Sequence, residues 1–340
     1  MHLLWRSCHY NKTAFQIYRH RVLQTYKDDQ NPVRIALIGE CMIELRKGAD
    51  GAIQQGFGGD SLNTAVYLAR LSQPHQIESY FVTALGEDTF SDQMVASWQQ
   101  ERVNCEFVAR LPAKLPGMYS IQVDETGERT FYYWRNEAAA KELMRFDGSD
   151  KLVAALEDFD VIYVSGISFA ILAEDCRIRL LGALANARAR GAKVVFDSNY
   201  RPRLWSSPEE TKACYAQVMQ QCDIALLTLD DEELLYGDTD AQQTLQRTHG
   251  FGVTEVLLKR GAEDCLVSMQ GQQTSVPAMV VTNVVDTTSA GDSFNGGYLA
   301  ARFSGASAIE AAQLGHRTAS TVIQYPGALI PKTATDALIN

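Results

Sequence analysis

Short apolar runs alternate with helical patterns along most of this chain, and that alternation limits the folds it can adopt. Segments such as 175–190 and 208–221 have the helical spacing of apolar residues and separate the runs. Such strand–helix alternation predicts a parallel sheet with helices on both faces. A polar residue or glycine follows each run, where open α/β sheets bind ligands. The runs lie at residues 35–38, 80–85, 161–164, 194–196, 224–227 and 256–258.

The composition is that of a globular protein and narrows its partners. Hydrophobic residues make up 46% and charged residues 21% of the 340 positions, with a formal net charge of −10. That charge argues against nucleic acid or an anionic membrane as a partner. No apolar run approaches the roughly 20 residues of a membrane helix. Seven cysteines without a Cys-x-x-Cys pair favour core thiols in a reducing cytoplasm over disulfides or a zinc site.

The segment around Asp292 carries the strongest chemical signal. A β-branched run at 280–285 predicts a strand, and residues 294–303 predict a helix after it. Between them, Gly291 permits a sharp turn that would direct backbone N–H groups to an anion at the helix N-terminus. Asp292 would then lie beside a bound phosphate and could take the proton of an attacking hydroxyl. The alternative is that Asp292 and Ser293 only cap the helix.

A second glycine-containing turn, Gly58-Gly59-Asp60, lies nearer the N-terminus. It opens a helical pattern, and Asp60 has the position of an N-cap. A cap alone does not account for the glycine pair, which lets a ligand approach the backbone closely. Two commoner nucleotide signatures are missing, because the chain has no Gly-x-x-x-x-Gly-Lys-Ser/Thr loop and residues 56–61 fail Gly-x-Gly-x-x-Gly. P-loop and dinucleotide-binding folds therefore lose their main support.

Together the two turns resemble the signatures of the ribokinase-like carbohydrate kinases. Residues 286–294, Asp-Thr-Thr-Ser-Ala-Gly-Asp-Ser-Phe, are similar to the family's C-terminal signature, although Ser289 replaces the first glycine of its usual Gly-Ala-Gly-Asp. Residues 58–63, Gly-Gly-Asp-Ser-Leu-Asn, fit the family's N-terminal Gly-Gly loop. The likeness covers residues 34–331.

This resemblance implies a ribokinase-like fold, a three-layer α/β/α sandwich with a mostly parallel central sheet and a small β-sheet lid. Residues 33–340 would form one kinase domain, with the lid drawn from segments 42–57 and 108–135. Residues 1–32 would be a poorly ordered N-terminal extension, and they contain no apolar core of signal-peptide type. Because lid strands often pair across a dimer in relatives, a homo-oligomer is expected.

Tyr133 and Arg135 share one face of a predicted lid strand. A phenol beside a guanidinium suits a ligand with hydroxyls and one carboxylate, although spacing alone favours a solvated arginine. Resemblance to the family's sugar-acid kinases reverses that preference and adds Tyr119 as a sugar contact. The segment 197–205 is similar to a further family element, in which Arg201 would be a second anion ligand rather than a surface charge.

The resemblance also assigns the nucleotide end of the site. Residues 228–231 lie where many relatives have Asn-x-x-Glu, and the aspartate there either orients metal-bound water or caps a helix. Residues 259–262 are similar to the family's nucleotide-phosphate turn, or they form an ordinary hairpin. The residues expected to bind the cofactor are Asn199, Thr228, Lys259, Gly261, Thr288, Ser289 and Gly291, with Asp231 for the metal.

The implied activity is ATP-dependent transfer of a phosphoryl group to the terminal (C6) hydroxyl of 2-keto-3-deoxygluconate. Asp292 would accept the hydroxyl proton, while the N–H groups of Ala290, Gly291 and Asp292 would bind the charge that develops on the phosphoryl group. ATP and Mg²⁺ are the expected cofactors, and a monovalent cation such as K⁺ stays open. The sugar would be held by Gly58, Gly59, Asp60 and Asn63.

Three rival functions remain. A fructose, ribose or nucleoside kinase would share the phosphoryl-transfer end but need no carboxylate ligand. A sugar-phosphate kinase would need a cluster of basic residues for a second phosphate, and only the pair Arg135 and Arg201 is found. A catalytically silent sugar-binding or regulatory protein would be expected to lose Asp292 or the glycine turn, and the sequence retains both.

Overall fold

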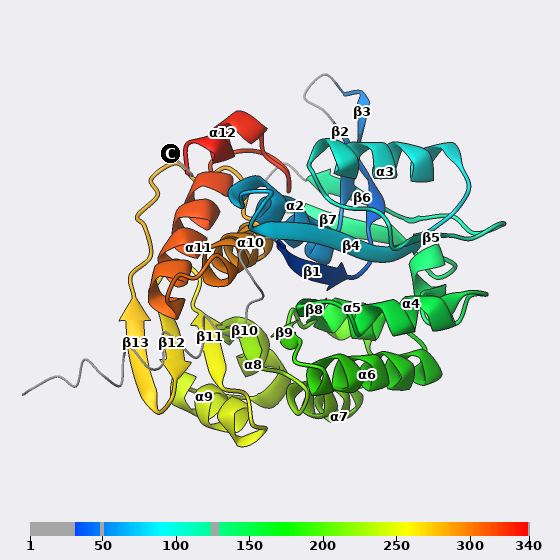
Figure 1. Cartoon of the computed structure of the whole chain (residues 1–340). Helices are drawn as coiled ribbons and strands as arrows, with labels where there is room; N and C mark the ends of the chain where they lie inside the picture. The colour runs from blue at the N-terminus through cyan, green and yellow to red at the C-terminus, as the bar shows by residue number, and fades with distance from the viewer. Residues whose placement is uncertain (1–30, 48–50, 124–128, 339–340) are drawn as a thin grey trace, which may run out of the picture.

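The computed structural model describes residues 31–47, 51–123 and 129–338, so most of the predicted N-terminal extension lies outside the described residues. Within them, nine strands form one large sheet in the order β13-β12-β11-β10-β9-β8-β1-β4-β5 (Figure 1). The strands from β11 to β5 run parallel, and β12 and β13 continue the sheet antiparallel. Their bounds are β1 (Val33–Ile38), β4 (Ile77–Leu85), β5 (Val108–Arg110), β8 (Val161–Ser165), β9 (Lys193–Asp197), β10 (Ile224–Thr228), β11 (Glu255–Lys259), β12 (Cys265–Met269) and β13 (Gln272–Val276).

Two helix layers cover the sheet because its strands are apolar on both faces. In β1, Ala36 and Ile38 belong to one core, whereas Ile35 and Leu37 belong to the other. This arrangement confirms the predicted three-layer sandwich. The first core is closed by α4 (Ser149–Leu156), α5 (Gly166–Ala170), α6 (Glu174–Ala189), α7 (Pro208–Met219), α8 (Leu229–Tyr236) and α9 (Ala241–Gly250), and the second by α2 (Asp60–Leu71), α3 (Thr89–Gln100), α10 (Ala290–Phe303) and α11 (Ala308–Val322).

A second, smaller sheet projects from the sandwich as a lid (Figure 1). Its strands are β2 (Met42–Lys47), β3 (Ile53–Gly58), β6 (Gly117–Val123) and β7 (Arg129–Trp134), in the order β3-β2-β6-β7. The expectation that the second lid segment begins at residue 108 is wrong, because Val108–Arg110 pairs with β4 at the edge of the large sheet. Residues 48–50 and 124–128 of the predicted lid lie outside the described residues.

The predicted strand at 280–285 is also wrong. This β-branched run forms a loop, in which Val280 is 93% exposed and therefore has no buried face to pair with a sheet. The loop returns to the body where the amides of Val285 and Asp286 both donate to Ile323 (2.8 and 3.1 Å). The helix after it starts earlier than predicted, at Ala290.

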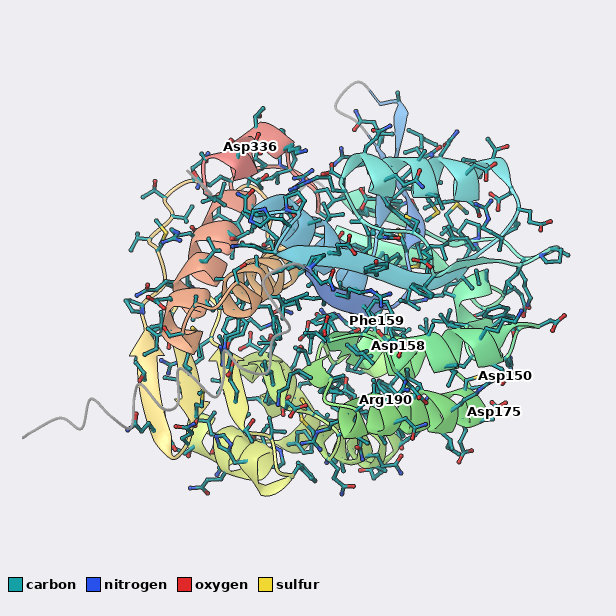
Figure 2. The ribbon with its side chains drawn as sticks, viewed as in Figure 1. Asp150, Asp158, Phe159, Asp175, Arg190 and Asp336 are labelled. Atoms are coloured by element: carbon teal, nitrogen blue, oxygen red, sulfur yellow. The ribbon has the colours of Figure 1, made fainter. Side chains whose placement is uncertain are left out.

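Charged side chains on and just beyond α4 and α6 pair at the surface, and Figure 2 labels Asp150, Asp158 and Arg190 among them. Arg190 reaches Asp158 at 3.1 Å, and Arg179 pairs with Asp150. Exposed pairs of this kind contribute little to stability. The described part of the chain holds no helix long and apolar enough to cross a membrane.

Candidate active site

The carboxyl ends of the parallel strands bring the predicted site residues to one edge of the large sheet. Asp197 ends β9, Thr228 ends β10 and Lys259 ends β11, and these strands are neighbours. The first half of α10 reaches the same edge, where the Nδ2 atom of Asn295 donates to Asp197 (2.9 Å). Segments far apart in the sequence therefore form one polar site at the open end of the sheet, as parallel sheets favour.

Close packing of α10 on α2 positions Asp292. Gly296 makes this packing possible, because a Cβ atom there would lie 2.6 Å from the Cβ of Tyr67 on α2. At that approach the Nδ2 atom of Asn63 donates to the Oδ2 atom of Asp292 (2.8 Å), across 229 residues of sequence. Ser289 donates to the same oxygen (3.2 Å). Asn63 and Asp292, which the sequence analysis assigned separately to the sugar and to proton transfer, are thus in direct contact.

The surroundings of Asp292 raise the pKa of its carboxyl towards neutral pH. Burial raises the pKa of Asp292 to about 7, and the carboxylates of Asp60 and Asp197 act in the same direction. The hydrogen bond from Asn63 and the charge of Lys259 act against this rise in pKa. A carboxylate with a pKa near the working pH is the form in which a general base is most effective.

Asp60 lies in the same cluster but is not the N-cap of α2. Gly59 takes that position, and Asp60 is the first helical residue. Its Oδ2 atom accepts a hydrogen bond from the Nδ2 atom of Asn199 (2.7 Å), and burial raises the pKa of Asp60. Asn199 therefore contacts Asp60, one of the residues expected to hold the sugar, and its expected place at the nucleotide stays a prediction.

The paired glycines at positions 58 and 59 are explained by the protein's own packing. A Cβ atom at Gly59 would collide with the carbonyl oxygen of Glu40, and one at Gly58 would collide with the hydroxyl of Tyr119. Gly58 therefore lets the side chain of Tyr119 on β6 lie against β3 within the lid, and Gly59 lets the start of α2 pack on the segment that follows β1. The close approach of a ligand to this glycine pair stays a prediction.

The N-terminus of α10 offers backbone donors but not the strained turn expected at Gly291. Gly291 is an ordinary helical residue, and a Cβ atom there would meet only the Nζ atom of Lys259, at 3.8 Å. The amide of Ala290 donates to Thr287 (3.2 Å), which corrects its predicted role. The amides of Gly291 and Asp292 lie in the first turn, where helix N–H groups have no intrahelical acceptor and favour anions.

The hydroxyls of Thr288 and Ser289 face protein groups. Thr288 donates to Asp286 and Ser289 donates to Asp292, and the side chain of the N-cap residue Ser289 accepts no hydrogen bond from the first-turn amides of α10. Asp286 also accepts from the amides of Thr288 (2.9 Å) and Gly327 (2.8 Å), so it fixes the turn ahead of α10. Both predicted nucleotide ligands thus shape the turn.

Lys259 and Gly261 differ in their surroundings. Gly261 lies in the β11–β12 hairpin with a left-handed φ of 60°, so the hairpin interpretation of this segment is correct. Lys259 is buried at the end of β11, where its Nζ atom donates to the Oδ1 atom of Asn295 (3.0 Å). Its ammonium also lies 3.6 Å from the Oδ1 atom of Asp197.

The exposed Arg201 forms an ion pair with the partly buried Asp231 beside this cluster. The Nη1 atom of Arg201 lies 3.4 Å from Asp231, which also accepts a hydrogen bond from the amide of Tyr200 (3.2 Å). Thr228 precedes this turn as the N-cap of α8 and makes no side-chain cap bond. Among the described residues, no group of three or more His, Cys, Asp or Glu side chains could hold a metal.

The lid presents a row of aromatic and charged side chains to the site. Tyr119 and Tyr133 face each other across β6 and β7, with ring centroids 5.9 Å apart. Tyr119 is 7% exposed and donates to Glu44, whereas Tyr133 is 50% exposed. Arg135 forms an ion pair with the buried Glu40, at the end of β1. The lid arginine therefore already has a protein carboxylate as partner.

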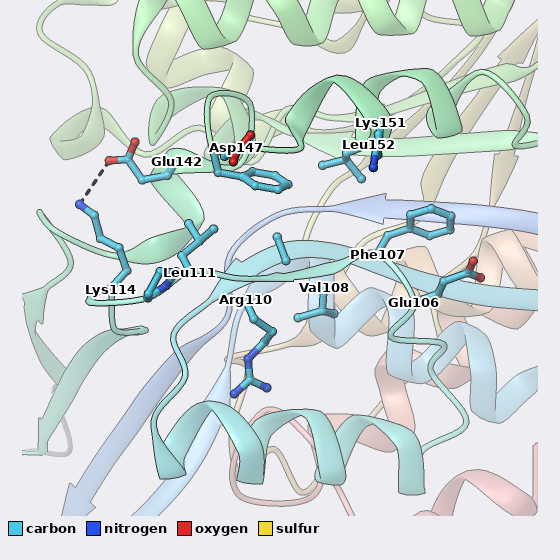
Figure 3. A pocket seen from close by; sticks show the side chains of 13 residues that line it. Glu106, Phe107, Val108, Arg110, Leu111, Lys114, Glu142, Asp147, Lys151 and Leu152 are labelled. Carbon is cyan, nitrogen blue, oxygen red and sulfur yellow. Dashed lines mark hydrogen bonds and ion pairs between the residues drawn. The ribbon is translucent and has the colours of Figure 1, made fainter.

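A pocket of about 740 Å³ lies elsewhere, at the β5 edge of the large sheet (Figure 3). None of the predicted site residues lines it. Two of its three cations form ion pairs, since Lys114 lies 3.4 Å from Glu142 and Arg110 pairs with Asp92, and its lining also holds Lys151, Glu106 and Asp147. With its charges balanced internally, this pocket shows no set of groups that converge on a ligand.

The comparisons with known proteins agree with this geometry. The model of the pfkB family carbohydrate kinases matches residues 33–335. The chain belongs to the pfkB family. A 2-dehydro-3-deoxygluconokinase of Dickeya dadantii is 55% identical over 307 residues, which are 89% of this chain and 98% of that protein. A fructokinase of Vibrio alginolyticus is only 28% identical over 269 residues, 78% of this chain and 83% of that protein.

The fold of this pfkB-family kinase is also that of solved relatives. The crystal structure of a 2-dehydro-3-deoxygluconokinase from Thermotoga maritima superimposes with a TM-score of 0.78, covering 92% of this chain and 99% of that one. At 21% sequence identity, that likeness concerns the fold alone.

Several polar residues of the site were missed by the sequence reasoning. Glu40 and Asp197 each stand at the carboxyl end of a buried strand, which is the signal that could have found them. Asn295 lies one helical turn after Asp292 and shares its face of α10. Tyr163 and Glu44 lie inside strands and carry no comparable signal.

Proposed function

We propose that this pfkB-family kinase phosphorylates the 6-hydroxyl of 2-dehydro-3-deoxy-D-gluconate (2-keto-3-deoxygluconate) with ATP, giving 2-dehydro-3-deoxy-6-phosphogluconate. The observation that carries the proposal is the position of Asp292, a base with a pKa of about 7 in the first turn of α10. The 55% identity to a 2-dehydro-3-deoxygluconokinase over 89% of the chain supports the choice of substrate.

In the proposed reaction Asp292 takes the proton of the C6 hydroxyl. The hydroxyl oxygen forms a bond to the γ-phosphorus while the bond from that phosphorus to the β–γ bridging oxygen breaks and ADP leaves. The first-turn amides of Gly291 and Asp292 would hold the oxygens of the transferring group, because fixed N–H dipoles stabilise charge where it develops. Closing the lid over the sugar would exclude water, which otherwise competes as acceptor.

The other end of the site would bind the sugar acid. Arginine presents five donors in a planar fork, so Arg135 can keep Glu40 on one side and bind a substrate carboxylate with its remaining N–H groups. Tyr133 is half-exposed beside it, with the guanidinium carbon of Arg135 5.9 Å from the ring centroid. Arg201 would approach from the sheet edge as the second cation. Sugar hydroxyls would meet Asp60, Asn63 and the backbone at Gly58 and Gly59.

ATP and Mg²⁺ fit the nucleotide side of this site. Asp231 is the carboxylate available to a metal there, and Mg²⁺ commonly takes one or two carboxylates, keeps several waters and binds substrate phosphates. When bound, Mg²⁺ neutralises charge on the β- and γ-phosphates. Thr228 and Gly261 would border the nucleotide, and a monovalent cation stays a prediction.

We propose a homo-oligomer that assembles through the lid. Side chains alternate along β7, so Tyr132 and Trp134 face away from Tyr133, and they are 46% and 58% exposed. Aromatic side chains of this kind are enriched in protein–protein interfaces. We further propose a cytoplasmic enzyme, since the six described cysteines are free thiols. Sedimentation of Trp134→Glu beside the unchanged chain would test the assembly.

One observation favours a neutral sugar instead. The ion pair with Glu40 compensates the charge of Arg135 before any substrate binds, which weakens the case for a carboxylate ligand. A fructose or ribose kinase would use the same phosphoryl-transfer end.

The deciding experiment measures ADP release with 2-dehydro-3-deoxygluconate, gluconate, fructose, ribose and a nucleoside. We expect kcat/KM for the keto-deoxy acid to exceed that for fructose by at least about 100-fold, because a site built for a polar group discriminates strongly against its absence. Preparations of Asp292→Asn serve as the blank for contaminating kinases. Preference for fructose or ribose would establish the neutral-sugar function, and no turnover with any acceptor would point to a sugar-binding regulator.

A further inference from the structure

Three aspartates converge at the base of the proposed phosphoryl-transfer site, and asparagine amides satisfy them. Asp60 accepts from Asn199 (2.7 Å), Asp197 from Asn295 (2.9 Å) and Asp292 from Asn63 (2.8 Å). An amide donor meets the hydrogen-bonding need of a carboxylate but leaves its charge in place. Clustered carboxylates therefore repel one another unless a cation lies among them.

Lys259 is the cation that lies among them. Its Nζ atom donates to the Oδ1 atom of Asn295 (3.0 Å), whose Nδ2 atom donates to Asp197. The Oδ1 atom of Asp197 is buried without a hydrogen-bond partner among the described residues, and the Lys259 ammonium lies 3.6 Å from it. Tyr163 donates to the Oδ2 atom of Asp197 (3.1 Å), which also accepts from Asn295, so the network joins β8, β9, β11 and α10.

The ammonium also lies beneath the helix turn that carries Asp292. A Cβ atom at Gly291 would be 3.8 Å from Nζ, which places the charge next to the residue preceding the base. Lys259 is 8% exposed, and its ammonium donates a hydrogen bond to Asn295, inside the protein. Asn295 and Asp197 therefore hold the ammonium among protein groups, where its charge acts on the neighbouring carboxylates.

We propose that Lys259 is a positioning residue for proton transfer, whose buried charge, held by Asn295 and Asp197, keeps Asp292 ionised and ready to accept the hydroxyl proton. The inference rests on the proposed role of Asp292 as the base. It differs from the expected role of Lys259 as a ligand of the nucleotide phosphates.

The groups that face Asp292 from each packed element act as this inference requires. From α2 come Asp60, Asn63 and Tyr67, from β8 Tyr163, from β9 Asp197, and from β11 Lys259. Burial is the largest cause of the raised pKa of Asp292. The charges of Asp60 and Asp197 raise this pKa further, while Asn63 and Lys259 lower it. Burial raises the pKa of both tyrosines, so they stay neutral and add no charge.

The test compares Lys259→Met, Asp197→Asn and the double variant in the full-length enzyme. The measured quantity is the acid limb of the pH profile of kcat/KM, which reports the free enzyme's base. An opposite charge within a few ångströms shifts a carboxyl pKa by about 1–3 units, so we expect Lys259→Met to move the limb up by about one unit. Asp197→Asn should move it down, and the double variant, with the original net charge, should return it close to the starting value.

Lys193→Met is the matched control. Lys193 also pairs with an aspartate, Asp223 (3.3 Å), but at the opposite end of β9. We expect the Lys193→Met variant to leave the acid limb of the kcat/KM profile where it is in the unchanged enzyme. If Lys259→Met instead raises KM for ATP with an unmoved limb, Lys259 is a phosphate ligand and the inference fails.

A second readout separates this inference from the proposed function. The carboxyl carbon of Asp292 can be titrated by NMR in ¹³C-aspartate-labelled protein without substrate, with Asp292→Asn assigning the signal. Absent turnover with 2-dehydro-3-deoxygluconate would overturn the substrate, while the NMR titration would still decide the role of Lys259. If Lys259→Met fails to fold, the charge-neutral double variant and Asp197→Asn can still be compared with the unchanged enzyme. Equal titration midpoints of Asp292 in all three proteins would refute the inference.

Discussion

The two ends of the site handle buried carboxylates in different ways. At the lid end Glu40 forms an ion pair with Arg135, beside Glu44, which accepts a hydrogen bond from Tyr119. At the α10 end, Asp292 is held by a neutral amide and a hydroxyl. An ionic partner compensates the charge of a buried acid directly, whereas neutral donors leave that charge in place.

This difference separates recognition from chemistry within one site. Burial raises the pKa of Glu40, but the guanidinium of Arg135 opposes that rise directly. Asp292 lacks such a contact, and its pKa reaches about 7. We infer that the lid end is organised to hold a ligand and the α10 end to move a proton. Substitutions at the two ends should therefore affect different kinetic constants.

The largest effect is expected from Asp292→Asn. The amide keeps the size of the side chain but cannot accept the proton, so kcat should fall by about 10²–10⁴-fold, the usual contribution of a general base. The KM for ATP should change little, because the first-turn amides of α10 remain. Steady-state kinetics at pH 8 provide the measurement. Near-normal turnover would remove Asp292 from the mechanism and end the contrast between the two ends.

Arg135→Gln should act mainly on KM for the sugar acid. Hydrogen bonds to charged groups contribute about 1.5–3 kcal/mol, which corresponds to roughly 10–150-fold in KM at about 1.4 kcal/mol per tenfold. The single variant also leaves Glu40 buried without its cation, which destabilises folding. Glu40→Gln/Arg135→Gln is the control that removes both charges, and it should keep the raised KM while recovering thermal stability. An unchanged KM would indicate a neutral-sugar substrate.

The sequence predicts which residues lie at this site better than it predicts which side chains contact each other there. Polar residues after buried strands mark the sheet edge, because strand direction and position follow from short apolar runs. The ion pair between Glu40 and Arg135 spans 95 residues and depends on how the lid docks, which no local pattern reports. The valines at 280–285 mislead because β-branched residues favour strands only where a partner strand exists. Gly291 misleads similarly, since a glycine near a helix start need not be strained.

The pH dependence of the unchanged enzyme should show the state of the α10 end. With a pKa of about 7 in the folded enzyme, Asp292 is ionised above that pH and protonated below it. Because only the ionised form accepts a proton, kcat/KM should fall by about tenfold for each pH unit below 7. A profile that stays flat down to pH 5 would show that Asp292 has an ordinary carboxyl pKa and that the two ends do not differ.

The smallest effects are expected at the two lid tyrosines, and their order tests the lid half of the comparison. The hydroxyl of Tyr119 already donates to Glu44, whereas the half-exposed Tyr133 has its hydroxyl available to a ligand. One neutral hydrogen bond contributes about 0.5–1.5 kcal/mol, so Tyr133→Phe should raise KM for the sugar acid by roughly 2–10-fold with kcat unchanged. Tyr119→Phe should raise KM less and lower thermal stability more, because it leaves the buried carboxylate of Glu44 without its donor. The reverse order in KM would mean that Glu44 releases Tyr119 when substrate binds, and that the lid end is not set before binding.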